Sequence, residues 1–323
     1  MAIGTHSHRG VILGEPEMKR FMQHFDRLSP SKVALTLLIL AAASSRSIFA
    51  APDRVTEPPQ AEVDRLKLSP HYRKYVSVEG FPIVGSAKVS DYALLEAAYI
   101  VRHMLSHRPD VREALTKNKV RLAVMAHDEL TTSVPEHSDL KPAEFWNRRA
   151  RGLGPTYQRP AASCAEENLL CLKGDPYAAE NILVHEFGHA IHDMGAATVD
   201  KTFDKRVRKA YEAAKKAGLW KGTYAMNNHH EYWGEGTQSW FDTNRKNDDI
   251  HNDVDTREKL KKYDPTLASL LEEVYGDGNW RYIRPHDRPE PERRHLNGFD
   301  RAKGPTFAWP KEPAASGRAL RKK

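Results

Sequence analysis

The chain has 323 residues, enough for one large domain or two small ones, and 40% of them are hydrophobic. Its 50 Lys and Arg exceed its 43 Asp and Glu, which gives a formal charge of +7. Because these basic residues are dispersed and no nucleic-acid-binding motif accompanies them, the composition argues against a nucleic-acid partner.

The N-terminal 50 residues have the layout of a secretory signal peptide. Residues 33–43 form an apolar run that is too short to span a bilayer, and small residues before Ala51 offer a cleavage site. Since fifty residues is long for a leader, we predict that translation starts at Met22. An uncleaved membrane anchor is the alternative. We therefore expect a secreted or extracytoplasmic protein, in the periplasm or cell envelope, without a membrane span after cleavage.

Residues 51–70 are polar and contain prolines, as in a linker, and residues 71–283 are expected to form one domain. Whether the segment 51–90 is a propeptide stays open. Apolar periodicity within the domain predicts helices over 91–106 and 109–116 and then a strand over 119–126.

Residues 127–175 contain few regular signals. The aromatic and basic stretch 145–157 could line a cleft or only cover the surface. Cys164 and Cys171, the only two cysteines, are seven residues apart. In an exported protein we expect them to form a disulfide that closes a small loop. A pair of metal-binding thiols is the weaker alternative, because no further ligands accompany them.

The run His185-Glu186-Phe187-Gly188-His189 predicts a metal site on a helix. Two histidines four apart project from one helix face about 40° apart, which allows them to bind one ion. Glu186 lies between them and can take a proton from a metal-bound water. Satisfied helix histidines without a metal are the alternative.

The helix that carries this motif is expected to begin at Asp175, with Pro176 in its first turn, and to end at Gly195. His192 lies one turn beyond His189. The metzincin signature requires glycine where this chain has His192, and it requires the third histidine where this chain has Gly195. A metzincin site is therefore disfavoured, His192 is not expected to bind this metal, and the third ligand must come from elsewhere.

A second helix is predicted over 229–244, with an asparagine as its cap. A zinc site with two histidines needs one carboxylate ligand and an open position, and Glu231 fits as that ligand. Glu235, one turn further, could accept the spare ring N–H of a ligand histidine and fix its tautomer. Four residues form the polar stripe of this helix: Glu231, Glu235, Gln238 and Asp242.

Two alternatives remain for this helix. His229 and His230, at its start, are rival ligands, and the paired glutamates could form a merely solvated face. Gly234 and Gly236 argue against a solvated face, since each costs roughly 1 kcal/mol relative to alanine in a helix. They make more sense where another backbone approaches closely.

These residues resemble a known family. His-Glu-Phe-Gly-His-Ala over 185–190, followed by Tyr224 and by Glu-Tyr-Trp-Gly-Glu over 231–235, is similar to the catalytic domain of anthrax lethal factor and the related Pro-Pro endopeptidases. These are gluzincin metallopeptidases of the zincin fold. The resemblance is specific over 183–192 and 224–241, and elsewhere only the order and spacing of elements agree.

The resemblance implies that His185, His189 and Glu231 bind one Zn²⁺ per chain and that Glu186 is the general base. It implies that Tyr224 donates a hydrogen bond to the oxyanion of the tetrahedral intermediate, with a buried core tyrosine as the alternative. Nothing in the chain matches the receptor-binding or substrate-docking regions of lethal factor, so its specificity does not transfer.

Helices predicted over 201–217 and 256–275 complete a helical C-terminal half. We therefore expect an α+β fold: a small mixed sheet, the metal-binding helix and the helical half that brings Glu231. Residues 284–323 hold eleven Lys or Arg, five Asp or Glu and six Pro, and are expected to be disordered. This basic tail could contact anionic envelope polymers or simply be solvated.

The sequence thus predicts a secreted endopeptidase that hydrolyses peptide bonds in peptide or protein substrates with a zinc-activated water. A catalytically silent zinc-bearing envelope or binding protein on the same scaffold is one alternative. An amidohydrolase that acts on cell-wall peptides is another. Neither the scissile bond nor the oligomeric state is predicted.

Overall fold

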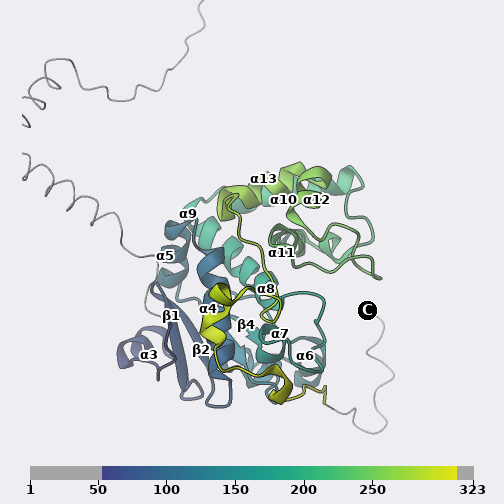
Figure 1. Ribbon diagram of the computed structural model, residues 1–323. Helices are drawn as coiled ribbons and strands as arrows, with labels where there is room; N and C mark the ends of the chain where they lie inside the picture. The colour runs from purple at the N-terminus through teal and green to yellow at the C-terminus, as the bar shows by residue number, and fades with distance from the viewer. Residues whose placement is uncertain (1–52, 311–323) are drawn as a thin grey trace, which may run out of the picture. The chain divides into compact units, whose positions relative to one another are not determined.

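The structure is a computed structural model, and it describes residues 53–310. The leader predicted over 1–50, with its start at Met22, lies outside the described residues. In the described part, no helix is both long and apolar enough to cross a membrane. A small mixed sheet and many helices make up the fold, so the predicted α+β class is confirmed (Figure 1).

The sheet has four strands in the order β1 (Lys74–Val78), β2 (Phe81–Gly85), β3 (Arg121–Met125) and β4 (Ala161–Ala165). β1 and β2 form an antiparallel hairpin, and Glu79 and Gly80 in its turn both have positive φ, 49° and 91°. Such turns match the twist of the flanking strands. β3 runs parallel to both β2 and β4, and it is the strand predicted over 119–126. The hairpin belongs to the sheet. Residues 74–85, which lie in the segment 51–90 considered as a propeptide, are therefore part of this fold.

The helices that connect β2 with β3 lie where the sequence predicts them. These are α4 (Asp91–Met104) and α5 (Pro109–Lys117). α4 packs against the β1–β2 hairpin, and Leu94 and Ile100 are fully buried. Short elements fill the connections: α3 (Gln60–Leu66), α6 (Ala143–Arg149), α7 (Glu166–Leu169) and the 3₁₀ turns η1 (Thr131–Ser133) and η2 (Pro135–His137).

The helix that carries His185 and His189 differs from the prediction at both ends. α8 runs over Ile182–Ala190 and is capped by Asn181, whose Oδ1 accepts from Val184 N at 3.1 Å. The Asp175 carboxylate instead accepts from Tyr177 N within a preceding turn. Gly195 does not end the helix, which continues as a π-helical segment, η3 (Ile191–Ala196), and then α9 (Ala197–Val199). A Cβ on Gly195 would lie 2.7 Å from Val111 Cγ1, so this glycine serves close packing on α5.

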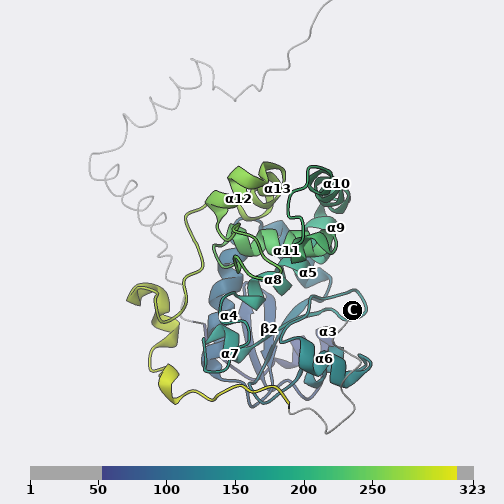
Figure 2. The same ribbon diagram turned by 90° about the vertical axis from the view of Figure 1, so that its right-hand side faces the viewer.

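The second half is helical, as predicted. Its elements are α10 (Phe203–Lys216), η4 (Tyr224–Met226), α11 (His229–Trp240), α12 (Arg257–Tyr263) and α13 (Pro265–Tyr275). The helix predicted over 256–275 is divided at Pro265, because proline cannot donate a helical hydrogen bond and Asp264 caps a new helix there. In both ribbon views α10, α12 and α13 lie on one side and the sheet on the other, with α8 and α11 between them (Figures 1 and 2).

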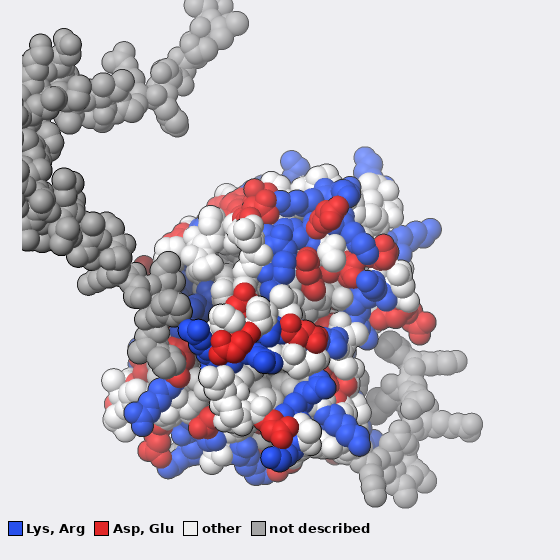
Figure 3. Space-filling model, in the orientation of Figure 1, with Lys and Arg blue, Asp and Glu red and all other residues white. Residues whose placement is uncertain are grey.

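Part of the predicted linker and tail is folded. Leu66 of α3 is buried, and so are Leu296 and Phe307 in the yellow C-terminal segment of Figure 1, which contains η5 (Glu290–Leu296) and η6 (Arg301–Lys303). Arg288 forms a fully buried ion pair with Glu96 of α4 at 2.7 Å. Disorder is therefore the wrong description for residues 284–310, while residues 311–323 lie outside the described part. Basic and acidic side chains are interspersed on the face in Figure 3.

The predicted disulfide is absent, since Cys164 and Cys171 are both free thiols. Cys164 lies on β4 and is buried in the hydrophobic core, whereas Cys171 follows α7 with a positive φ of 52° and has its Sγ 3.9 Å from Asn168 O. The helical turn of α7 separates the two residues. Burial raises the pKa of both thiols, that of Cys171 to about 11, which leaves them protonated and poorly nucleophilic.

Candidate metal centre

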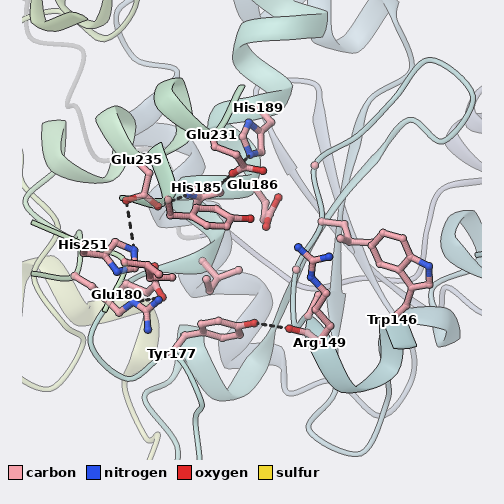
Figure 4. A pocket seen from close by; sticks show the side chains of 18 residues that line it. Trp146, Arg149, Tyr177, Glu180, His185, Glu186, His189, Glu231, Glu235 and His251 are labelled. Carbon is pink, nitrogen blue, oxygen red and sulfur yellow. Dashed lines mark hydrogen bonds and ion pairs between the residues drawn. The ribbon is translucent and has the colours of Figure 1, made fainter. Parts of the chain in front are cut away.

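Three side chains from two packed helices converge on one point. His185 and His189 project from α8, and Glu231 projects from the first turn of α11 (Figure 4). Glu231 Oε2 lies 3.0 Å from His185 Nε2 and 3.7 Å from His189 Nε2. One donor atom from each of the three residues lies within 4.8 Å of the other two. The structure therefore brings together the three residues that the sequence suggested as ligands.

Glycine lets α11 approach α8 at this point. A Cβ on Gly234 would lie 2.7 Å from His185 Cε1 and 3.0 Å from His189 Cε1, distances that side-chain carbons do not adopt. The helices are also held by a hydrogen bond of 3.0 Å from Trp233 Nε1 to Gly188 O. The absence of a side chain at Gly234 thus allows a close approach, as the sequence predicted. The groups that approach are the two imidazole rings and not a backbone.

Gln238 holds the His185 ring in one tautomer. The Gln238 amide nitrogen donates to Glu180 Oε2 at 2.9 Å and approaches Asn181 O at 3.3 Å, so its oxygen must face the ring. That oxygen lies 2.8 Å from His185 Nδ1, which therefore carries the proton. The opposite nitrogen, Nε2, faces Glu231 Oε2 at 3.0 Å. It donates to this carboxylate when it is protonated, and it offers its lone pair to a metal ion when it is not.

Glu235 is not the nearest partner of His185. Its Oε1 lies 3.7 Å from His185 Nδ1, whereas Gln238 Oε1 lies 2.8 Å from the same nitrogen. Gln238 therefore accepts the ring N–H that the sequence assigned to Glu235. Glu235 Oε2 instead accepts from Asn244 Nδ2 at 3.1 Å and lies 3.5 Å from His251 Nε2. Glu235 is a buried carboxylate that lies between His185 and His251.

A cavity of about 480 Å³ opens in front of the three ligands. Glu186 lines it, and burial raises the pKa of this carboxyl above its usual range. Burial lowers the pKa of His185, but the hydrogen bond to Glu231 and the charges of Glu186 and Glu235 outweigh it and raise this pKa to about 10. These carboxylates strongly favour a positive charge at His185, whether a proton or a metal ion.

Tyr224 also lines the cavity. It lies in the 3₁₀ turn η4 just before α11, where its backbone N–H donates to Ile250 O at 2.8 Å. Its ring centre is 6.3 Å from that of His185. Burial raises the pKa of Tyr224 well above neutrality, so its hydroxyl keeps its proton and can donate it in a hydrogen bond. The side chain faces the cavity, not the hydrophobic core.

The opposite wall comes from the stretch 145–157. Trp146 and Arg149 of α6 and the loop 152–154 line the cavity, whereas Tyr157 is 64% exposed outside it. Part of the stretch that the sequence left undecided thus lines the cleft, and part of it covers the surface. Leu153 pairs with Ser163 beside β4, in antiparallel direction. The sequence could not decide between cleft and surface for this stretch, because its loop meets the helix of His185 and His189 only through tertiary packing.

Three further histidines near these helices are not part of this centre. His192, His229 and His230 gather in a separate cluster with Asp193 and Asp204. The rival role of His229 and His230 as third ligand is therefore not supported by their positions.

Comparison with known proteins gives little further information. No protein-family model matches the chain, and no curated protein sequence matches it. Among solved structures it is similar to the Pro-Pro endopeptidase from Paenibacillus alvei, at 15% sequence identity and a TM-score of 0.36. That alignment covers 61% of this chain and 98% of the other. At this level the similarity carries no argument about activity.

Proposed function

We propose that this protein is a zinc-dependent endopeptidase with a zincin-like active site. The observation that carries the proposal is the convergence of His185, His189 and Glu231 on one point, with Glu186 in the same cavity. The resemblance of the motif residues to lethal-factor-like gluzincins supports the same assignment.

The donor set suits zinc. Two imidazole nitrogens and one carboxylate, with an open side toward a cavity, are typical of catalytic zinc sites. The tautomer imposed by Gln238 and the close approach at Gly234 both position His185 for such a role. Zn²⁺, when bound, would polarise the scissile carbonyl and lower the pKa of the attacking water.

The protein's own residues supply the remaining steps. Glu186 takes a proton from the attacking water and delivers it to the leaving amine, a task suited to its raised pKa. Tyr224, which stays protonated, donates a hydrogen bond to the oxygen that becomes negatively charged. The 152–154 loop and Trp146 form the wall against which a peptide would lie.

We further propose that the protein acts outside the cytoplasm, because the sequence of residues 1–50 resembles a secretory leader. N-terminal sequencing of the protein recovered from the culture medium or envelope fraction tests this part. A chain that begins near Ala51 is the expected result, and an intact leader on a cytoplasmic protein would contradict it.

The experiment for the activity combines metal analysis with peptide cleavage. The purified protein, saturated with zinc and digested against a broad peptide library, should cleave internal peptide bonds. Glu186→Gln should keep the zinc at this centre but lose cleavage by at least about a hundredfold, since general acid–base catalysis contributes that much. Glu231→Ala should lose both zinc and cleavage.

Two outcomes would contradict the proposal. Zinc retained in full at this centre by Glu231→Ala would remove Glu231 from the ligands. Undiminished cleavage in Glu186→Gln would remove the base. If the folded, zinc-bound protein cleaves no linear peptide, the silent scaffold is the better description, unless cell-wall peptides are hydrolysed, which would point to the amidohydrolase.

A further inference from the structure

A second group of histidines and aspartates lies beside the first centre. It consists of His192 and Asp193 in η3, His230 in the first turn of α11, and Asp204 and His229, and is called the His192 cluster below. His192, Asp193 and His230 each offer one ligand atom within 4.8 Å of the other two. None of these residues is needed for the peptidase chemistry proposed above.

Buried polar atoms of this cluster lack hydrogen bonds. They are both ring nitrogens of His192, His230 Nδ1, His229 Nε2 and Asp204 Oδ1. His192 is completely buried, so water does not compensate for it from the bulk. A buried polar group without a partner is costly, and a concentration of them at one place calls for a missing ligand.

The spacing of the facing atoms is that of a ligand set. His192 Nδ1 lies 3.4 Å from Asp193 Oδ1, and His230 Nδ1 lies 3.2 Å from Asp193 Oδ2, yet neither nitrogen has hydrogen-bond geometry. Two atoms that bind the same zinc ion at about 2.1 Å in a tetrahedral arrangement are separated by about 3.4 Å. An ion between these atoms would satisfy all of them at once.

We propose that His192 Nδ1, the Asp193 carboxylate and His230 Nδ1 bind a second divalent transition-metal ion. Two imidazoles and one carboxylate suit zinc, cobalt, nickel or copper, whereas calcium and magnesium prefer oxygen ligands alone. The ion can enter from solvent, because the Asp193 and His230 side chains are 27% and 39% exposed.

Asp204 lies next to the His192 ring nitrogen that does not face the proposed ion. Its Oδ1 lies 3.4 Å from His192 Nε2, on the side of the ring opposite Asp193. With an ion on Nδ1, Nε2 carries the proton and points it toward this carboxylate, as in other carboxylate–histidine–metal arrangements. Asp204 Oδ1 is also 3.2 Å from His229 Nε2. His229 therefore shares this carboxylate.

Local backbone structure brings these ligands together. The π-helical segment η3 begins directly after α8 and holds His192 and Asp193 in consecutive positions. Such π-helical insertions are frequent at functional sites. On the other side, Asn228 caps α11 by accepting from His230 N at 2.9 Å, which fixes the turn that carries His230. Since Glu231 is the next residue, an ion in this site would also hold the turn that supplies the third ligand of the first centre.

The test is a zinc titration of the full chain without an affinity tag, stripped with a chelator beforehand. Bound metal is counted by elemental analysis after equilibrium dialysis, and the fold of each variant is checked by circular dichroism. Wild type should bind two equivalents. Asp193→Asn/His230→Gln should bind one, and so should the first-centre variant His189→Gln, while the combination of all three changes should bind none.

The matched control is His286→Gln/Asp287→Asn, an exposed His–Asp pair outside both sites, which should still bind two equivalents. If the double change at Asp193 and His230 prevents folding, each single variant should weaken the second equivalent by at least about tenfold. Two equivalents in the folded Asp193→Asn/His230→Gln protein, or a single equivalent in wild type that His189→Gln abolishes, would overturn this proposal. Failure of the peptidase proposal would instead appear as full zinc retention at the first centre in Glu231→Ala or as undiminished cleavage in Glu186→Gln.

Discussion

Glu186 and Glu231 are both half-buried carboxylates beside the same histidines, and their surroundings shift their pKa values in opposite directions. Burial raises the pKa of Glu231, but the hydrogen bonds and charges of His185 and His189 outweigh it and hold this pKa below its usual range. For Glu186 burial prevails, and its pKa is raised. Opposed environments of this kind separate a permanently charged ligand from a group that can exchange a proton.

Tyr224 is expected to act on the transition state and not on zinc. Tyr224→Phe should keep its zinc and lower kcat by about a hundredfold to a thousandfold, with a smaller change in KM, as when other oxyanion donors are removed. Steady-state kinetics on the best library peptide measure both constants. Tyr157→Phe, at an exposed tyrosine outside the cavity, is the control. A kcat within twofold of wild type in Tyr224→Phe would mean that this side chain only lines the wall.

Gln238 is expected to influence metal affinity through His185. Gln238→Leu removes the acceptor that fixes the ring tautomer, so zinc affinity at the first centre should fall about 10–100-fold. Competition with a zinc-binding dye measures this affinity. Gln60→Leu on α3, where the side chain is exposed and its amide donates to Asp64 of the same helix, should leave the affinity unchanged. Equal affinities in the two variants would show that Gln238 does not position the ligand.

At the level of elements, strongly periodic helices could be predicted and the structures that depend on distant contacts could not. α4, α5, α10 and α11 lie close to their predicted ranges because their apolar stripes alone specify them. β4 has the sequence Ala-Ala-Ser-Cys-Ala, which has little strand propensity, and it is a strand because it pairs with β3. The π-helical continuation after α8 has no sequence signature either.

In the candidate site, too, residues at regular helical spacing could be predicted, and residues placed by distant contacts could not. The motif spacing and the family resemblance were enough to name three candidate ligands and a candidate base, and the structure brings these residues together at one cavity. Gln238 was visible only as one member of a polar stripe, and its role follows from Glu180 and Asn181, which no spacing connects to it. The cavity wall at 152–154 likewise depends on the pairing of Leu153 with Ser163.

The contact between α8 and α11 gives a test at this scale. Gly234→Ala would place a methyl group 2.7 Å from the His185 ring, so the helices or the imidazoles must move. We expect loss of zinc at this centre and of cleavage, with a lower melting temperature. Gly278→Ala, whose Cβ would meet nothing within 4 Å, is the matched control and should behave as wild type. Full zinc affinity at this centre in Gly234→Ala would contradict the described packing.

In the whole molecule, the segment after residue 283 is part of the fold up to residue 310. Composition alone suggested disorder, because prolines and basic residues dominate it. What composition cannot reveal is that Arg288 is buried against Glu96, where His295 Nε2 also lies 2.7 Å from the same carboxylate. One ion pair with α4, almost two hundred residues earlier in the chain, thus anchors a segment of otherwise polar character.

This ion pair predicts a large effect on stability. Arg288→Ala leaves the Glu96 carboxylate buried without its guanidinium, which should lower the free energy of unfolding by about 3–5 kcal/mol. Urea denaturation followed by tryptophan fluorescence measures the change. Arg293→Ala, at an exposed arginine of the same segment, should stay within about 0.5 kcal/mol of wild type. Equal stabilities would mean that the C-terminal segment is not anchored at Arg288.

The proposed function depends on the binding of a catalytic zinc ion by His185, His189 and Glu231. Anomalous diffraction from zinc-soaked crystals, recorded on both sides of the zinc absorption edge, tests it most directly. We expect an anomalous peak about 2.0–2.2 Å from His185 Nε2, His189 Nε2 and the Glu231 carboxylate, with Glu186 facing it across the cavity. A zinc-saturated crystal without a peak at bonding distance from these three side chains would contradict it.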